Sequence, residues 1–351
     1  MGEGLGDAAL VAILGFAGGL GLGLAARIGR FCTLGAIEDA FYGGSDIRMR
    51  MWAVALGVAI MGAFGLAGVG LLDPEASFYL NRGWNPVAHV TGGLVFGYGM
   101  ALAGNCGYGV LARVGGGDLR AFVVVLVMAI SAYAAISGPF ASLRVTLFPD
   151  GLVGTGTPAG FAHLLSGATG LSPVFLGLGI GVAIAIAGLA PARMRSDRRA
   201  MGWATVVGFS IVAGWAATAF VADRSLGAVP VESHTFSAPL GDTVLYVMLA
   251  SGMKLNFGVG SVAGVLCGAL IGSIRRGHFR WEACEDPREL RRQIGGAVLM
   301  GFGGAIAVGC SVGQGLSAFS LLAFSAPLTL AAIMIGAWLG LRQLIHGFAP
   351  S

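Results

Sequence analysis

The residues of this chain that could do chemistry most plainly are two cysteines in matching glycine-rich segments. Residues 97–109 contain Cys106, and residues 301–313 contain Cys310. When the two cysteines are superimposed, several positions share a residue type, namely Gly92/Gly296, Gly97/Gly301, Gly99/Gly303, Ala103/Ala307 and Gly109/Gly313. A lone cysteine is usually a small apolar core residue, but repetition of the whole loop favours two related functional thiols.

A third cysteine, Cys32, follows Arg27 and Arg30 and opens a segment that reads as an amphipathic helix. Two arginines beside a thiol raise the local concentration of anions. The alternative is that both arginines mark a membrane boundary and that Cys32 is a core residue. Cys267 and Cys284 have no comparable surroundings, and we interpret both as structural.

The surroundings of the thiols limit the chemistry that they could perform. Soft metals bind thiolates, but no His, Met or carboxylate stands near either loop at ligand spacing. Nucleophilic catalysis needs a base beside the thiol, and none is apparent. We therefore expect no metal, no cofactor and no enzymatic activity. A neutral, polarisable thiol that donates a weak hydrogen bond suits a sulfur-bearing anion that must bind and then leave.

The composition places these thiols in a membrane. The chain has 351 residues, of which 56% are hydrophobic and 11% charged, whereas soluble domains are about 25% charged. Runs of about 20 apolar residues are long enough to span a bilayer as helices; they are residues 51–72, 121–143, 172–192, 202–222, 258–274 and 316–341. The pattern predicts an all-α polytopic membrane protein surrounded by lipids, with residues 1–351 as one integral membrane domain.

The repeated loops divide the chain into two pseudo-repeat halves, residues 1–145 and 200–351. Each half has a glycine-rich segment that leads into its cysteine, at residues 87–104 and 294–309. Both segments are short for a full crossing, so we expect broken or re-entrant half-helices that meet at the membrane centre. The residues before the first segment carry little charge and those before the second are rich in arginine, which predicts that the two enter from opposite faces as an inverted repeat.

The residues that flank the two thiols complete the candidate site. Gly104 and Gly309 allow the backbone to bend and to approach a solute closely. Gly107 and Ser311 begin new helices, whose positive N-terminal ends attract anions.

Basic charge is almost entirely arginine, and two arginine clusters, at residues 193–199 and 275–292, are expected in the cytoplasm by the positive-inside rule. Lys254 is the only lysine and stands at the edge of apolar sequence. An ionisable residue in that position is a candidate for function, although a lysine that extends to the membrane interface would look the same.

Four short segments together resemble the YeeE/YedE family of bacterial sulfur-compound transporters. Residues 27–32 resemble its QRGRFC element, residues 92–106 and 295–310 resemble its two GG…GFG…LAGGC elements, and residues 253–258 resemble its MKYINWG stretch. The resemblance implies thiosulfate uptake across the bacterial inner (cytoplasmic) membrane by an hourglass-like inverted-repeat fold. It also implies a TusA-like cytoplasmic sulfur-carrier protein as partner.

The family's three pathway cysteines fall on Cys32, Cys106 and Cys310, between which thiosulfate would pass through S–H···S contacts, helped by Arg30 and Lys254. Asn105 and Val308 stand where the family pattern has glycine, so a related solute such as sulfite or selenite is an alternative. Two other classes are open, a membrane thiol sulfurtransferase and a subunit that only recruits a soluble sulfur carrier.

Overall fold

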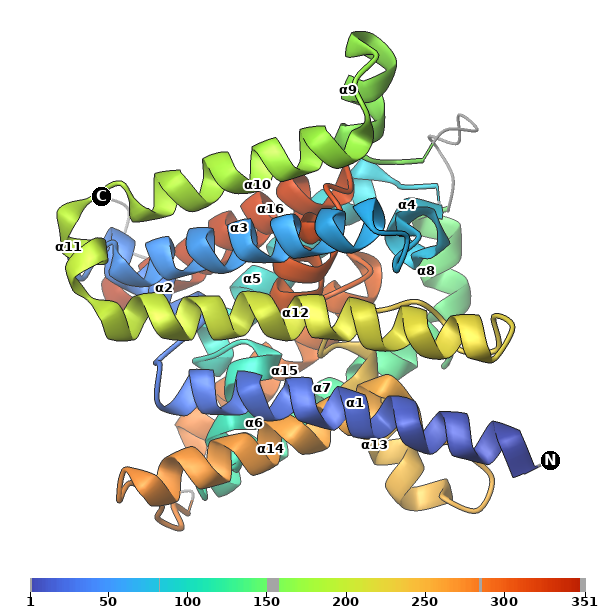
Figure 1. The fold of residues 1–351 in the computed structure, drawn as a ribbon. Coiled ribbons are helices and arrows are strands. Elements are labelled where there is room, and N and C mark those ends of the chain that lie inside the picture. Colours follow the sequence, from blue (N-terminus) through green and yellow to red (C-terminus); the bar gives the residue numbers. More distant parts are fainter. Residues whose placement is uncertain (1, 82, 150–157, 284–285, 348–351) are drawn as a thin grey trace.

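The protein is a bundle of long helices, most of which run side by side (Figure 1). The computed structural model describes residues 2–81, 83–149, 158–283 and 286–347, and every regular element within these ranges is a helix. Seven spans in the described residues are long and apolar enough to cross a membrane. They are α1 (Gly2–Arg27), α3 (Ile47–Gly68), α5 with α6 (Pro86–Ala103 and Gly107–Val114), α7 (Leu119–Ile136), α12 (Arg198–Arg224), α14 (Phe257–Arg275) and α16 (Ser325–His346). The all-α membrane fold is thus confirmed.

Helices α5 and α15 (Pro287–Ile306) form a pair that runs antiparallel in close contact. A Cβ atom at Gly92 would lie 2.8 Å from the Gly303 carbonyl oxygen, and one at Gly99 would lie 2.6 Å from that of Gly296. Such small residues let membrane helices approach closely. In the sequence Gly92 matches Gly296 and Gly99 matches Gly303, so the two contacts are exchanged as in a two-fold interface.

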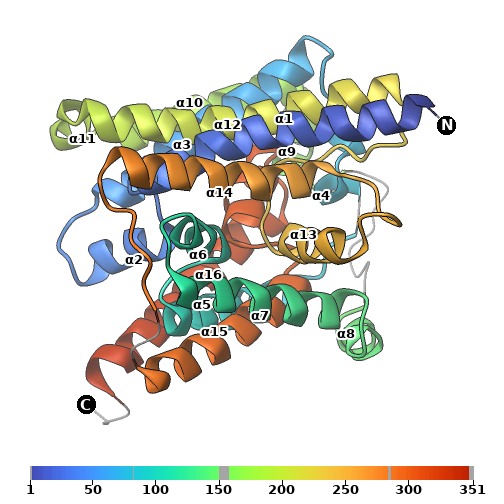
Figure 2. The same ribbon diagram turned by 90° about the horizontal axis from the view of Figure 1, so that it is seen from below.

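The other helices pack in matching pairs: α7 and α16 lie beside α15 and α5, and α1, α3, α12 and α14 form another layer (Figure 2). The packed pairs are α1 with α14, α12 with α3, α16 with α5, α7 with α15, α2 (Thr33–Phe41) with α3, and α13 (Ala238–Leu249) with α14. In chain order α1, α2, α3, α5 and α7 correspond to α12, α13, α14, α15 and α16, and each contact of one set has its counterpart in the other.

Residues 141–196 form a separate set of helices. These are α8 (Ala141–Leu147), α9 (Phe161–Thr169), α10 (Pro173–Leu189) and α11 (Ala192–Ser196). The pair α9 and α10 is bent by 119°, and α10 packs along α3, where Gly57 meets Gly181. Two short elements, η1 (Pro74–Ala76) and α4 (Phe78–Asn81), lie near α8 at one end of the bundle, opposite α11 (Figure 1).

Helix α5 has the 18 residues predicted for the first glycine-rich segment, α15 is longer than predicted, and the breaks after both helices are confirmed. At 1.5 Å per residue the 18 residues of α5 extend about 27 Å, close to the roughly 30 Å of a bilayer core. Helix α15 begins at Pro287, well before the predicted start, because Asp286 caps it by accepting a hydrogen bond from Arg288 N at 2.8 Å. New helices do follow each cysteine, as α6 and as a turn containing the π-helix η2 (Gly313–Ala318).

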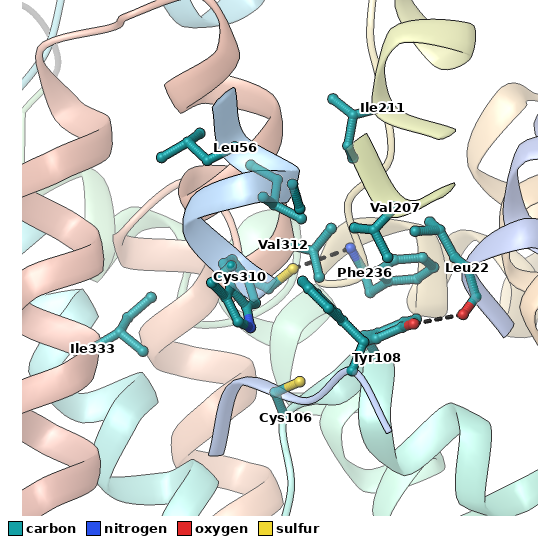
Figure 3. Packing of buried hydrophobic residues seen from close by; sticks show 14 of the residues in the cluster. Leu22, Leu56, Cys106, Tyr108, Val207, Ile211, Phe236, Cys310, Val312 and Ile333 are labelled. Carbon is teal, nitrogen blue, oxygen red and sulfur yellow. Dashed lines mark hydrogen bonds between the residues drawn. The ribbon is translucent and has the colours of Figure 1, made fainter. Parts of the chain in front are cut away.

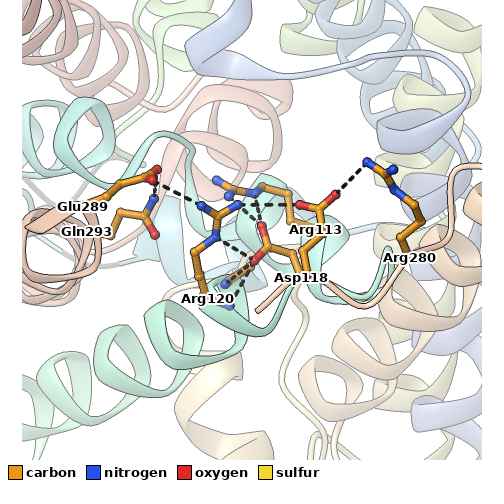
Figure 4. A network of polar contacts seen from close by, with 8 residues as sticks. Arg113, Asp118, Arg120, Arg280, Glu289 and Gln293 are labelled. Carbon is orange, nitrogen blue, oxygen red and sulfur yellow. Dashed lines mark hydrogen bonds and ion pairs between the residues drawn. The ribbon is translucent and has the colours of Figure 1, made fainter. Parts of the chain in front are cut away.

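A polar network fixes the start of α7 against α15 (Figure 4). Asp118 caps α7 and accepts a hydrogen bond from Arg113 Nη2 at 2.6 Å. Arg120 Nη1 donates a hydrogen bond to Glu289 Oε2 at 3.2 Å. Burial raises the pKa of Asp118, but the Arg113 guanidinium outweighs this and holds the pKa below its usual value. Glu289 in the first turn of α15 is therefore paired within the protein.

Candidate functional site

The three predicted pathway cysteines lie at breaks between helices. Cys32 precedes α2 and is partly buried, whereas Cys106 and Cys310 are 0% and 1% exposed. Figure 3 shows the latter two in the packed core near Tyr108, Phe236 and Val312. All three are free thiols.

Thr33 connects the surroundings of all three cysteines. Its Oγ1 lies 3.7 Å from Cys106 Sγ and donates to Ser311 Oγ at 3.1 Å. Thr33 directly follows Cys32, and Ser311 directly follows Cys310. The hydrogen bond between Thr33 and Ser311 therefore joins the segments of Cys32 and Cys310, and the same Thr33 hydroxyl also contacts Cys106. Neither Thr33 nor its contact with Ser311 could be inferred from sequence spacing.

Cys310 is held by the segment that precedes α13. Its Sγ accepts hydrogen bonds from Phe236 N at 3.3 Å and Gly313 N at 3.4 Å, and lies 3.7 Å from Thr235 Oγ1. The two backbone N–H groups use lone pairs of the sulfur, while in the contact with Thr235 either the thiol or the hydroxyl can donate. Sequence reasoning missed Thr235 because no motif marks it.

Cys32 has a different set of partners. Its thiol donates to Asn105 Oδ1 at 3.1 Å and accepts from Gly35 N at 3.3 Å. The same Asn105 oxygen accepts from Cys106 N at 3.0 Å. A Cβ atom at Gly109 would lie 2.0 Å from this oxygen, so the glycine is required for the Asn105 side chain to sit here.

Two cavities lie on opposite sides of the thiols. The first, which we call the basic vestibule, has a volume of about 400 Å³ and includes Arg27, Arg30, Cys32, Arg48, Asn105 and Arg276 in its lining. The second, the distal vestibule, has a volume of about 350 Å³ and includes Tyr79, Arg144, Glu232, Thr235, Val308 and Gly309. Arg48 lies in the first turn of α3 and Tyr79 follows its far end, so the two vestibules are at opposite ends of the bundle.

The two vestibules differ in charge. Four arginines and one carboxylate, Glu38, line the basic vestibule, whereas Arg144 and Glu232 are the charged residues lining the distal one. Burial raises the pKa of Glu232 to about 7. Thr33, Cys106 and Ser311, which line neither vestibule, are all buried and contact one another through hydroxyl and thiol groups; we call these three residues the barrier.

Comparison with known protein families matches residues 28–339 to the sulphur transport family. The chain belongs to this family. It is 28% identical over 329 residues to the thiosulfate transporter TsuA of Escherichia coli (strain K12), with 90% of each chain covered. It is 27% identical over 327 residues to the thiosulfate transporter TsuA of Spirochaeta thermophila, with 90% of this chain and 94% of that one covered. The sequence-based assignment to a sulfur transporter family, and to a transporter rather than an enzyme, is confirmed.

Within this transporter fold, most of the predicted site residues gather around the thiols. Gly104 ends α5 with φ +78° and lines the basic vestibule, and Gly309, with φ +151°, lines the distal one. Gly107 begins α6 and is buried, with room for no side chain beside Met128. Arg30 lines the basic vestibule.

One residue predicted for the site, Lys254, lies elsewhere. Lys254 is exposed in the loop between α13 and α14 and does not line either vestibule. Cys284 lies outside the described residues. Among the described residues, no group of three or more His, Cys, Asp or Glu side chains is arranged to hold a metal ion.

Proposed function

We propose that this protein imports thiosulfate along a path from the distal vestibule past Cys310, Cys106 and Cys32 to the basic vestibule. The observation that carries the proposal is the arrangement of the barrier: the thiols and the Thr33–Ser311 contact occupy the space between two cavities at opposite ends of the bundle. Both relatives, which match 90% of the chain, are thiosulfate transporters.

The orientation of the path follows from charge. Arg193 and Arg195 of α11 and Arg275 and Arg276 at the end of α14 lie at the end of the bundle that holds the basic vestibule. The positive-inside rule places this end in the cytoplasm, which corresponds to a bacterial inner-membrane importer. The TusA-like sulfur-carrier protein implied by the family resemblance would then receive the imported thiosulfate at this face.

The chemistry proposed for the path is a series of weak, soft contacts. Thiosulfate would meet Cys310 first, because Thr235, which lines the distal vestibule, contacts the Cys310 sulfur. It would pass to Cys106 with Thr33 and Ser311 as additional donors, and then to Cys32. Neutral thiols donate weakly, and weak binding at several sites allows a solute to enter and to leave. Because Cys106 and Ser311 are fully buried, side chains in the barrier must move for each passage.

We further propose that the two halves, residues 1–145 and 200–351, form an inverted repeat. The reciprocal contacts of Gly92 with Gly303 and of Gly99 with Gly296 support it. So do the directions of corresponding helices: α1 ends at the basic vestibule with Arg27, whereas its counterpart α12 begins at that end. Inverted repeats of this kind place the solute path at the repeat interface, where the thiols lie.

The proposal is tested by growth on thiosulfate. In a strain that lacks sulfate uptake, Cys106→Ala and Cys310→Ala should abolish growth on thiosulfate at unchanged membrane expression, while Cys267→Ala in α14 should support it. Normal growth of both path variants would refute the thiol path. Competition by sulfite or selenite would identify a different solute, and a persulfide on Cys106 or Cys310 detected by mass spectrometry would indicate sulfur transfer.

A further inference from the structure

The basic vestibule has the features of a binding site in its own right. We propose that it binds a small divalent sulfur oxyanion, such as sulfate, from the cytoplasmic side, and that this anion inhibits import while it is bound. The inference rests on the proposed function for its place on the path. The proposal is carried by four groups that face one cavity: Arg30, Arg48, Arg276 and the amide of Asn105.

Arg30 is a cation of this cavity that has no partner among the described residues, and Glu38 is the one carboxylate in the lining. Arg30 forms no ion pair or hydrogen bond with any other described residue, and it is exposed. Its φ is +55°, a left-handed conformation that residues other than glycine rarely adopt. A strained backbone that presents an unpaired guanidinium beside Cys32 points to a ligand rather than to a structural role.

Arg48 and Arg276 are held in place but keep donors available. Arg48 Nε pairs with Asp39 Oδ2 at 3.1 Å, while its Nη1 lies over Gly35, where a Cβ atom would approach it to 2.2 Å. Arg276 Nη2 donates to Ile28 O at 2.7 Å. Each guanidinium is thus tethered through one nitrogen and has further N–H groups, in a planar fork that suits oxyanions.

Asn105 adds a neutral donor beside the thiol. Its Oδ1 is occupied by the Cys32 thiol and by Cys106 N, and its Nδ2 has no partner among the described residues. An amide N–H₂ group can donate two hydrogen bonds to an oxyanion. A dianion between Asn105 and the arginines would lie directly against Cys32, the last thiol of the proposed path.

Inhibition follows from position and charge. A dianion at Cys32 occupies the place that the incoming solute must reach, and like charges at close range repel strongly where solvent is limited. The distal vestibule offers one arginine opposed by Glu232, so anions should bind more weakly there. Binding on the cytoplasmic side would therefore reduce import when the cell already holds sulfur oxyanions.

The test uses right-side-out membrane vesicles that contain the full-length protein. Vesicles preloaded with sulfate, or with chloride at the same ionic strength, are compared for the initial rate of labelled thiosulfate uptake. Interior sulfate should reduce the rate of the wild type about fivefold, within the usual range of coupling between two sites. In Arg30→Gln the uptake rates of sulfate-loaded and chloride-loaded vesicles should be nearly equal, whatever the absolute uptake rate of this variant. Arg292→Gln, an exposed arginine of α15 outside the vestibule, should keep the wild-type ratio of these two rates.

A second measurement does not depend on transport. Sulfate added to purified protein should slow alkylation of Cys32 by N-ethylmaleimide about fivefold in the wild type and not in Arg30→Gln, as quantified by peptide mass spectrometry. Unchanged alkylation and uptake ratios with sulfate, or equal effects on Arg30→Gln and the wild type, would overturn the proposed anion site. Absence of thiosulfate uptake in all vesicles, with sulfate still protecting Cys32, would overturn the proposed import and the inhibition of it but leave the anion site supported.

Discussion

The thiol of Cys32 donates a hydrogen bond of 3.1 Å to Asn105 Oδ1, an oxygen that also accepts from Cys106 N at 3.0 Å. The one proton that Cys32 could offer to a sulfur anion is therefore already bound to oxygen. On the proposed path, a solute at Cys32 would exchange S–H···O for S–H···S, which would weaken its binding at the last step and favour its release. Asn105 would thus be a positioning residue for the last thiol of that path.

Replacement of Asn105 by glycine should release the Cys32 proton. A hydrogen bond contributes about 1 kcal/mol net, or about a fivefold change in an equilibrium. We expect alkylation of Cys32 to become about fivefold faster and the KM for thiosulfate to fall by a similar factor, because the competing acceptor is gone. An unchanged KM together with unchanged alkylation would show that Asn105 does not restrain this thiol.

Gly109 should depend on Asn105. In Gly109→Ala the new methyl group would approach Asn105 Oδ1 to 2.0 Å, and this clash would force the Asn105 side chain against its neighbours beside the thiols. Uptake should fall about tenfold or more, consistent with a barrier change above 1.4 kcal/mol. The double variant Asn105→Gly, Gly109→Ala should recover much of the rate, since the clash is removed. Failure of this rescue would mean that Gly109 is needed for another reason.

Val308 and Gly104 occupy matched positions of the two loops and differ in strain. Val308 has φ +56° and Gly104 has φ +78°, and the left-handed region costs a residue with a side chain about 1–2 kcal/mol. Gln314 holds the second loop by donating to Val308 O at 3.0 Å and to Ala307 O at 3.2 Å. We expect Val308→Gly to raise thermal stability in detergent, and Gly104→Val to lower it. A lower thermal stability of Val308→Gly, or a higher one of Gly104→Val, would contradict the assignment of backbone strain to position 308.

Uptake should depend on pH through Glu232. Because burial raises the pKa of Glu232 to about 7, this carboxyl is mostly charged above neutral pH and mostly neutral below it. The charged form repels an anion in the distal vestibule, so the uptake rate should rise as the external pH falls from about 8 to about 6. In Glu232→Gln the uptake rate should no longer depend on pH over this range and should equal the higher rate that the wild type reaches at low pH. Asp223→Asn, an exposed carboxylate at the same end of the bundle, should retain it; a flat profile in the wild type would exclude this role for Glu232.

The sequence predicted those features that depend on local pattern. Apolar runs indicated the membrane helices, and the repeated glycine loops indicated the breaks at Cys106 and Cys310 and the helices that follow them. It did not predict the full length of α15, because the charged residues of its first turns look like a loop. In the structure Glu289 is paired with Arg120, a residue distant in sequence, so those turns are stable as helix.

The contacts that complete the site could not be read from the chain. Thr33 meets Ser311, and Thr235 meets Cys310, only because segments that are distant in the sequence pack against each other. Neither hydroxyl belongs to a motif. Lys254 shows the reverse case: its unusual residue type marked it, yet the fold leaves it exposed in a loop away from both vestibules.

The most direct test of the central claim is the initial rate of labelled thiosulfate uptake into proteoliposomes that contain wild-type protein, Cys106→Ala or Cys267→Ala at equal density. Cys106 is fully buried in the barrier, whereas Cys267 is a thiol of α14 away from it. The thiol path predicts a loss of at least about tenfold for Cys106→Ala and a wild-type rate for Cys267→Ala. A wild-type rate for Cys106→Ala would contradict it.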